Sequence, residues 1–176
     1  MSEVKTNKVS PSTGTAFTLG DSGDTFTLPS GATLTVSGTS TIASLGASTA
    51  SGTLSMADNI VSRPVMKDYG ETVNAIGAIG GGTQDIDLTL GNVVTGTVDT
   101  SETTFTFSNS PTTGTAGSFT LILTNGGSQT VNWPAAVDWA GSTAPTLTTS
   151  GVDVITFTTI DGGTIWYGFA AGLDMG

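Results

Sequence analysis

The stretch that decides the fold covers residues 117–168 and reads GSFTLILTNGGSQTVNWPAAVDWAGSTAPTLTTSGVDVITFTTIDGGTIWYG. It contains all three tryptophans of the chain and two turn signals, Asn125-Gly126-Gly127 and Asp161-Gly162-Gly163. Asn-Gly and Asp-Gly pairs tolerate the positive φ that tight hairpin turns require, so both signals predict hairpins. Between the turns, apolar and polar residues alternate, which places successive side chains on opposite faces of a strand. The stretch therefore predicts antiparallel strands around a shared hydrophobic core.

The alternation continues upstream, so we expect a head domain over residues 72–176. The expected strands are 72–79, 84–90, 92–98, 103–108, 118–124, 128–133, 145–149, 152–160 and 164–170. Short strands at spacings of about a dozen residues, without sustained helical periodicity, favour an antiparallel β-sandwich of jelly-roll type. Pro134 is expected to end the strand before it, because proline has no N–H to donate. The fold class expected for the whole chain is all-β.

The N-terminal third has a different organisation. Residues 1–15 form a polar arm, and residues 16–48 contain the repeat AFTLGDSGD, TFTLPSGA, TLTVSGTS, TIASLGAS. Strands this short and this poor in large side chains make no core alone. A stacked solenoid and a trimeric fibre that shares one apolar axis both solve this problem. We favour the intertwined trimeric shaft or stalk, with an ordinary β-meander of the main domain as the alternative. Residues 49–71 are the expected linker.

Charge and composition exclude several classes of function. The net charge is −10, and no Lys or Arg follows Lys67. Nucleic-acid binding requires cations that neutralise phosphates, so neither DNA nor RNA is an expected partner. No apolar run is long enough for a membrane span, so membrane insertion is not expected, and the N-terminus lacks the apolar region of a secretory signal. Charged residues make up only 10% of the chain, which suits an extracellular or particle-surface protein.

The chain contains neither cysteine nor histidine. This removes disulfides, Ser-His-Asp and Cys-His catalysis, and the usual zinc, copper and iron ligand sets. No cofactor and no metal are expected. Asp21 with Asp24, and Asp99 with Glu102, are close loop acids, for which turn capping is a better interpretation than calcium binding.

Asp85 and Asp87 are the strongest candidates for carboxylate chemistry. They lie two residues apart in an expected strand and therefore share a face. Glycosidases need two such acids across a cleft with opposed pKa shifts. However, Ile86, Leu88 and Leu90 are expected to occupy the core side, which leaves the acids toward solvent. A polysaccharide-degrading enzyme that uses Asp85, Asp87 or Asp161 is therefore a minor alternative, and the chain is expected not to be an enzyme.

Aromatic residues are the better candidates for a binding surface. Trp139, Trp166 and Tyr167 have rings that could contact a partner protein or stack on a glycan. Trp166 falls on the strand face opposite Ile165, Tyr167 and Phe169, so one of these two sets must point away from the core. Packing of the tryptophans is the favoured interpretation, with Trp133 filling the core and Trp139 covering its end or packing against a neighbouring subunit. Glycan or receptor contact is the alternative.

The block at residues 131–168 resembles a domain that recurs in structural proteins of tailed bacteriophages, notably marine ones. The resemblance rests on Trp133-Pro134, Trp139 with Gly141, Ala144-Pro145, Asp153, and Asp161-Gly162-Gly163 followed by Trp166-Tyr167. The linker SRPVMKDYGE at residues 62–71 is similar to a junction ahead of such domains, and the repeats at 16–48 are similar to phage fibre shafts.

The resemblance implies a non-enzymatic virion protein, assembled in the host cytoplasm and released by lysis. It implies a homotrimer whose partners are capsid or tail subunits. The size of the chain fits a capsid decoration protein or a short head fibre. The alternative is a tail fibre or adhesin whose head domain binds a host surface glycan or receptor.

Overall fold

The computed structural model describes residues 25, 27–33, 35 and 60–176. The chain divides into two units, Met1–Val61 and Ser62–Gly176. In the first unit the described residues include a turn at Ser30 and Gly31, closed by the Ala32 N–H, which donates to the Pro29 carbonyl at 3.0 Å. The expected arm at 1–15, most of the expected shaft at 16–48 and the linker up to residue 59 lie outside the described residues. Residues 60–72 are exposed and carry no strand.

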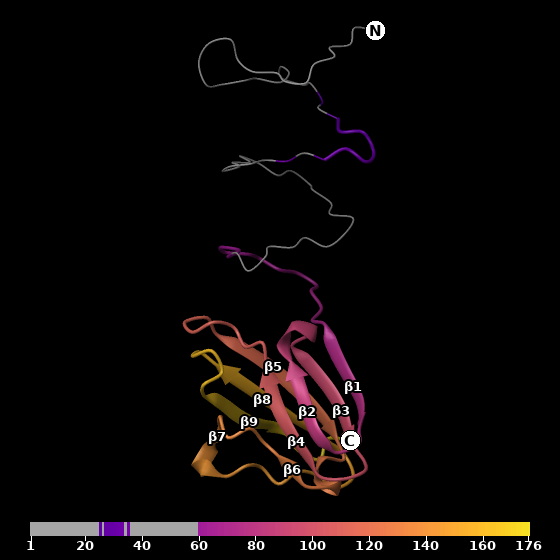
Figure 1. Ribbon diagram of the computed structural model, residues 1–176, viewed down its shortest axis with the longest axis vertical. Coiled ribbons are helices and arrows are strands. Elements are labelled where there is room, and N and C mark those ends of the chain that lie inside the picture. Colours follow the sequence, from indigo (N-terminus) through magenta and orange to yellow (C-terminus); the bar gives the residue numbers. More distant parts are fainter. Residues whose placement is uncertain (1–24, 26, 34, 36–59) are drawn as a thin grey trace. The chain divides into compact units, whose positions relative to one another are not determined.

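The second unit is built from strands, as expected for the all-β class (Figure 1). One sheet has the order β1-β3-β5-β8-β9-β7, and the other has the order β2-β4-β6. The six-stranded sheet contains β1 (Val73–Ile79), β3 (Val93–Val98), β5 (Gly117–Thr124), β7 (Val137–Trp139), β8 (Val152–Thr159) and β9 (Trp166–Gly172). The three-stranded sheet contains β2 (Gly82–Asp87), β4 (Thr103–Ser108) and β6 (Val131–Asn132). Three short 3₁₀ turns, η1 (Leu88–Leu90), η2 (Gly126–Ser128) and η3 (Ala140–Ser142), connect strands.

The expectation of a purely antiparallel arrangement is wrong. The first six strands alternate between the two sheets, and β1, β3 and β5 pair in parallel, as do β2, β4 and β6. Parallel neighbours need a crossover connection, usually a helix. Here the crossover from one strand of a sheet to the next is a strand of the other sheet. Antiparallel pairing joins β5 to β8 and β8 to β9.

The core lies between the two sheets and includes residues of both. Alternate residues of β3, β5 and β8 are buried, in keeping with the period of two in the sequence. Across the β5–β8 pair, Phe119 is opposite Phe157 and Leu121 is opposite Ile155. The fully buried apolar residues are Ile79, Ile86, Val94, Val98, Phe105, Phe119, Leu121, Leu123, Ile155, Phe157 and Trp166.

Of the two expected hairpins, only the second forms. Asp161-Gly162-Gly163 lies in the turn between antiparallel β8 and β9, as expected. Asn125 does adopt a left-handed conformation, with φ 56°. However, η2 follows it and the chain crosses to the three-stranded sheet, where β6 pairs in parallel with β4. The strand expected at 128–133 is consequently reduced to Val131–Asn132.

Two other segments differ from the expected strands. Residues 145–149 form no strand, although the Gly127 N–H donates to the Thr148 carbonyl at 2.8 Å and Leu147 packs on the core. Residues 137–139, expected to lie in a loop, form β7 at the sheet edge beside β9. The strand expected at 84–90 ends at Asp87, and Leu90 on η1 is 55% exposed instead of facing the core. No helix among the described residues is long and apolar enough to cross a membrane.

Candidate functional site

Trp166 belongs to the core and not to the surface. It begins β9 and is only 1% exposed. Its ring meets Phe107 edge-on with 5.4 Å between centroids and Phe119 with 5.5 Å. Such edge-to-face contacts add to the stabilisation from burial. The alternative interpretation, that Trp166 contacts a glycan or a partner, is therefore wrong, because the ring is buried in the core.

Trp139 has one side on the core and one side toward solvent. Its ring lies 5.4 Å from Trp133 and 5.6 Å from Phe157, centroid to centroid. Trp133 itself stacks on Phe105 at 5.4 Å. Trp139 pairs with Gly168 of β9, and a Cβ placed on that glycine would lie 2.7 Å from the indole ring. The missing side chain at Gly168 thus makes the space that the indole occupies.

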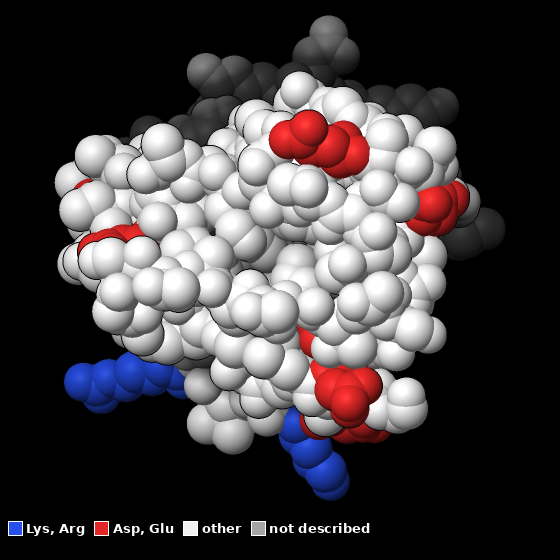
Figure 2. Space-filling model, turned by 90° about the horizontal axis from the view of Figure 1, so that it is seen from below, with Lys and Arg blue, Asp and Glu red and all other residues white. Residues whose placement is uncertain are grey.

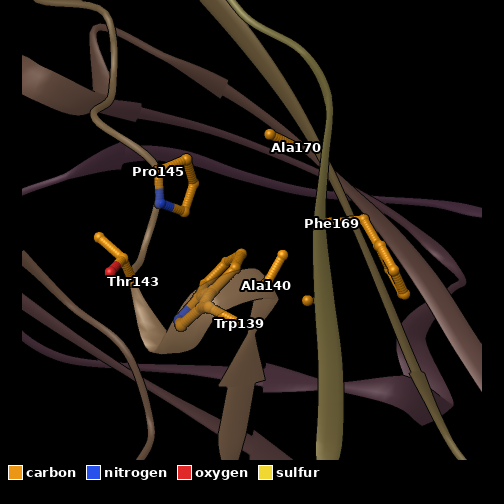
Figure 3. A pocket seen from close by; sticks show the side chains of 7 residues that line it. Trp139, Ala140, Thr143, Pro145, Phe169 and Ala170 are labelled. Carbon is orange, nitrogen blue, oxygen red and sulfur yellow. The ribbon is translucent and has the colours of Figure 1, made fainter.

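A shallow pocket of about 320 Å³ lies beside Trp139 (Figure 3). Its lining is Trp139, Ala140, Thr143, Pro145, Gly168, Phe169 and Ala170. Figure 3 shows the Trp139 ring and Pro145 on one side of β9, while the Phe169 ring points to the other side. The lining holds one hydroxyl, from Thr143, and no charged group. Such a surface is suited to an apolar side chain or the apolar face of a sugar ring.

Tyr167 belongs to the set that points away from the core. It is 42% exposed, and Ile165 and Phe169, two residues away on either side, are 39% and 53% exposed. Ile160, at the end of β8, is 61% exposed. We call these four residues the hairpin stripe. Because Tyr167 and Trp139 project from opposite faces of the six-stranded sheet, the structure does not bring Trp139, Trp166 and Tyr167 together in one site.

Asp85 and Asp87 share the outer face of the three-stranded sheet, and Ile86 between them is fully buried. Asp85 accepts hydrogen bonds from the Thr106 hydroxyl at 2.7 Å and the Ser108 hydroxyl at 2.5 Å. Thr106 pairs with Asp85 in the β2–β4 register, so these contacts join neighbouring strands. The arrangement is a cross-strand polar ladder that stabilises the sheet.

Asp87 caps the turn that follows β2. It accepts from the Thr89 N–H at 2.9 Å, the Thr89 hydroxyl at 2.7 Å and the Asn109 amide at 2.8 Å. The Asn109 hydrogen bond, followed by those from Thr89, holds the pKa of Asp87 below its ordinary value of 3.8. A general acid near neutral pH needs a raised pKa, so the shift has the wrong sign for that role.

Asp161 organises the β8–β9 turn. It accepts from the Ile165 N–H at 3.0 Å and the Thr159 hydroxyl at 2.9 Å. The Ile165 N–H is the largest cause that lowers the pKa of Asp161. Of the loop acids Asp99 and Glu102, Glu102 accepts from the Asn132 amide at 2.6 Å and Asp99 accepts from the Thr100 hydroxyl at 2.8 Å. No group of three potential metal-ligating side chains occurs within the described ranges.

Asp153 is the structurally important residue that chemical reasoning from the sequence missed. It lies on β8, has no exposed surface, and accepts from the Thr148 N–H and the Thr148 hydroxyl, both at 2.7 Å. The Asp174 N–H donates to it at 3.2 Å, which fixes the chain after β9 against the loop before β8. The sequence does contain a signal for this role, because Asp153 is a carboxylate at an inward-facing position of a strand, between Val152 and Val154.

The described carboxylates named above are thus occupied in caps, turns and cross-strand contacts, and the tryptophans mainly in packing. Comparison with family models, with curated proteins and with solved structures finds no match to this chain.

Proposed function

We propose that this chain is a non-enzymatic structural protein of a tailed-phage virion, forming a homotrimeric capsid decoration or short head fibre. The observation that carries the proposal is the role of the residues on which the phage resemblance rests. Trp133 and Trp139 pack in one aromatic cluster, Asp153 ties a loop to a strand, and Asp161 shapes the β8–β9 turn. The residues of the shared pattern therefore hold the fold together, which is what a structural protein requires of them.

The build of the second unit also supports a passive role. Two parallel ladders pack on one core, and a hydroxyl–carboxylate bond from Thr106 to Asp85 links β4 to β2 within one of them. This gives durability to a chain without cysteine. A sandwich-type head on a repeat shaft is part of the same proposal, with residues 72–176 as the head and 16–48 as the shaft.

The proposal is tested on particles. Antibodies raised against the recombinant chain are applied to density-gradient-purified virions from the source culture, with electron microscopy as the readout. We expect labelling at regular positions on the particle, and co-sedimentation of the chain with capsid protein. Recovery of the chain in the soluble lysate, with none on sedimented particles, would contradict the virion role.

A second candidate function is that of an adhesin whose head binds a host glycan. The specific observation in its favour is the pocket beside Trp139, because a sugar ring can stack on an indole face while Thr143 bonds a hydroxyl. Titration with host envelope polysaccharides, followed by tryptophan fluorescence, tests it. Binding is expected to weaken in Thr143→Val and to be unaffected in the matched surface change Thr112→Val. Equal binding by both variants would contradict a glycan site here.

A further inference from the structure

Residues 63–67, RPVMK, expose apolar side chains that no other residue in the described part of the chain covers. We call them the basic segment. Val65 is 98% exposed and Met66 is 61% exposed. Large apolar side chains exposed together in a soluble protein mark a contact surface. The segment begins and ends with a cation, Arg63 and Lys67.

Charge in the second unit is divided between this segment and the remainder. After Lys67 the sequence has ten acidic residues and no Lys or Arg. Figure 2 shows the end of the unit where β6 and β7 lie, with acidic residues at its margin and an uncharged, hollowed centre. A partner for the basic segment thus needs an apolar strip with carboxylates beside it, and the body of this same chain offers one.

The hairpin stripe is that strip. Asp161 lies in its turn, and the Ile165 N–H donates to the Asp161 carboxylate. Asp138 of β7 is opposite Tyr167 in the β7–β9 register, so both project from the same face. The stripe therefore has exposed apolar side chains with one carboxylate in the turn at its end and a second beside Tyr167. The basic segment has exposed apolar side chains with a cation at each end.

The basic segment lies at a distance from the stripe of its own chain. The basic segment precedes β1 at one edge of the six-stranded sheet, whereas β9 lies four strand positions away, a distance of about 19 Å. Among the described residues none covers Val65, and the stripe of another copy is an available acceptor.

We propose that the basic segment of one copy docks on the hairpin stripe of a second copy, with its cations toward Asp138 and Asp161. This contact rests on the proposed function in that it supplies the subunit contact of the homotrimer. The two surfaces differ, so the contact is head to tail. Head-to-tail contacts close into rings when the rotation between subunits allows it, and a trimer is such a ring.

The test uses the full chain in size-exclusion chromatography with light scattering, over a range of concentrations. We expect the unaltered chain to be oligomeric and to dissociate as salt rises, because surface charge pairs are screened. We prepare one variant with Arg63→Glu and Lys67→Glu and a second variant with Asp138→Lys. Each should associate at least about tenfold more weakly, because each turns attractive surface ion pairs into repulsive ones. A chain that carries all three changes should regain association, because every contact of the ring then again joins a basic surface to an acidic one.

The apolar part is tested with Tyr167→Ser, which should dissociate the oligomer. Leu90→Ser is the matched control, because Leu90 is 55% exposed on η1 and lies outside the stripe. Circular dichroism and tryptophan fluorescence verify that each variant is folded. A monomeric unaltered chain, no regained association in the chain with all three charge changes, or equal effects of Leu90→Ser and Tyr167→Ser would each overturn the docking. If the oligomer persisted in every variant, the subunit contact would lie outside the basic segment and the hairpin stripe, and the docking would be wrong. The virion role would then still be decided by the particle-labelling experiment.

Discussion

Asp153 is a buried carboxylate with three hydrogen-bond donors from two separate segments. Replacing it with alanine leaves the Thr148 N–H without its acceptor and the Asp174 N–H with only the Thr148 hydroxyl. We expect Asp153→Ala to lower the free energy of unfolding by about 2–4 kcal/mol, since buried donors that lose a charged partner are costly. Urea unfolding followed by tryptophan fluorescence measures this. Asp99→Ala, at an exposed position, should change stability by less than about 0.5 kcal/mol, and similar effects in both would contradict the role of Asp153.

Asp87 predicts a dependence of stability on pH with a defined sign. Its pKa in the folded protein is lowered, chiefly by Asn109 and then by Thr89. A carboxyl with a depressed folded pKa contributes stability above its unfolded pKa, near 3.9, and this contribution is lost as pH falls through the folded pKa. The difference in melting temperature between the unaltered chain and Asp87→Ala should therefore narrow below about pH 4.

Asn109→Gly gives the matched test of the cause. Asn109 has φ 55°, which glycine tolerates, so this change removes the amide donor with little backbone strain. The pH at which the Asp87 contribution disappears should move upward in Asn109→Gly. An unchanged profile would show that the amide does not hold the carboxylate in its charged form.

At this scale the sequence could place residues on strand faces but could not always choose the buried face. It predicted correctly that Asp85 and Asp87 lie opposite buried Ile86. Near Trp166 both faces of the strand are apolar, so alternation alone left two solutions. The choice depends on Phe107 and Phe119, which are distant in sequence and meet the indole only after folding.

Among the elements, the β7–β9 pair depends on one absent side chain. A Cβ on Gly168 would lie 2.7–3.0 Å from Trp139 ring atoms. Gly168→Ala should therefore displace the indole and destabilise the fold by about 1–3 kcal/mol, the usual cost of overpacking. Chemical denaturation gives the magnitude, and a shift in tryptophan emission reports the indole. Gly80→Ala is the control, because no atom lies within 4 Å of its Cβ position; if both variants kept full stability, the proposed clash would be absent.

Strand positions were predictable, but pairing partners were not. The strand at 103–108 has the observed bounds, and most others agree within a few residues. Asn125-Gly126-Gly127 has the local chemistry of a hairpin, yet the β5 edge that a hairpin would fill pairs with β8. The turn preference of residues 125–127 depends only on neighbouring residues, so it cannot predict that β8, which follows later in the sequence, pairs with β5. For the same reason, the parallel pairing of β1, β3 and β5 left no local signal.

At the scale of the whole molecule, the large acidic excess has a cost in stability. After Ser62 the sequence has ten acidic residues against Arg63 and Lys67, and like charges in a compact unit repel one another. Raising NaCl from about 0.01 M to about 0.1 M shortens the screening length from about 30 Å to about 10 Å. We expect the urea midpoint of unfolding to rise over this range, by an amount that corresponds to about 0.5–1 kcal/mol.

A variant with fewer charges provides the comparison. Glu71→Gln combined with Asp99→Asn removes two exposed carboxylates and should reduce the rise in midpoint. A midpoint that falls with salt would mean that attractive charge contacts outweigh the repulsion.

The position of β8 between β5 and β9 has a consequence for the chain as it is translated. Phe119 on β5 stacks on Phe157 of β8, with 4.8 Å between ring centroids, but residues 125–151 must be synthesised between the two strands. At roughly 5–20 residues per second, a nascent chain leaves the edge of β5 open, and the face of Phe119 that stacks on Phe157 uncovered, for a few seconds. An open edge of this kind recruits other chains. Slow codons between positions 125 and 151 would lengthen that interval, so codon choice in this short stretch is expected to govern soluble yield more than codon choice elsewhere.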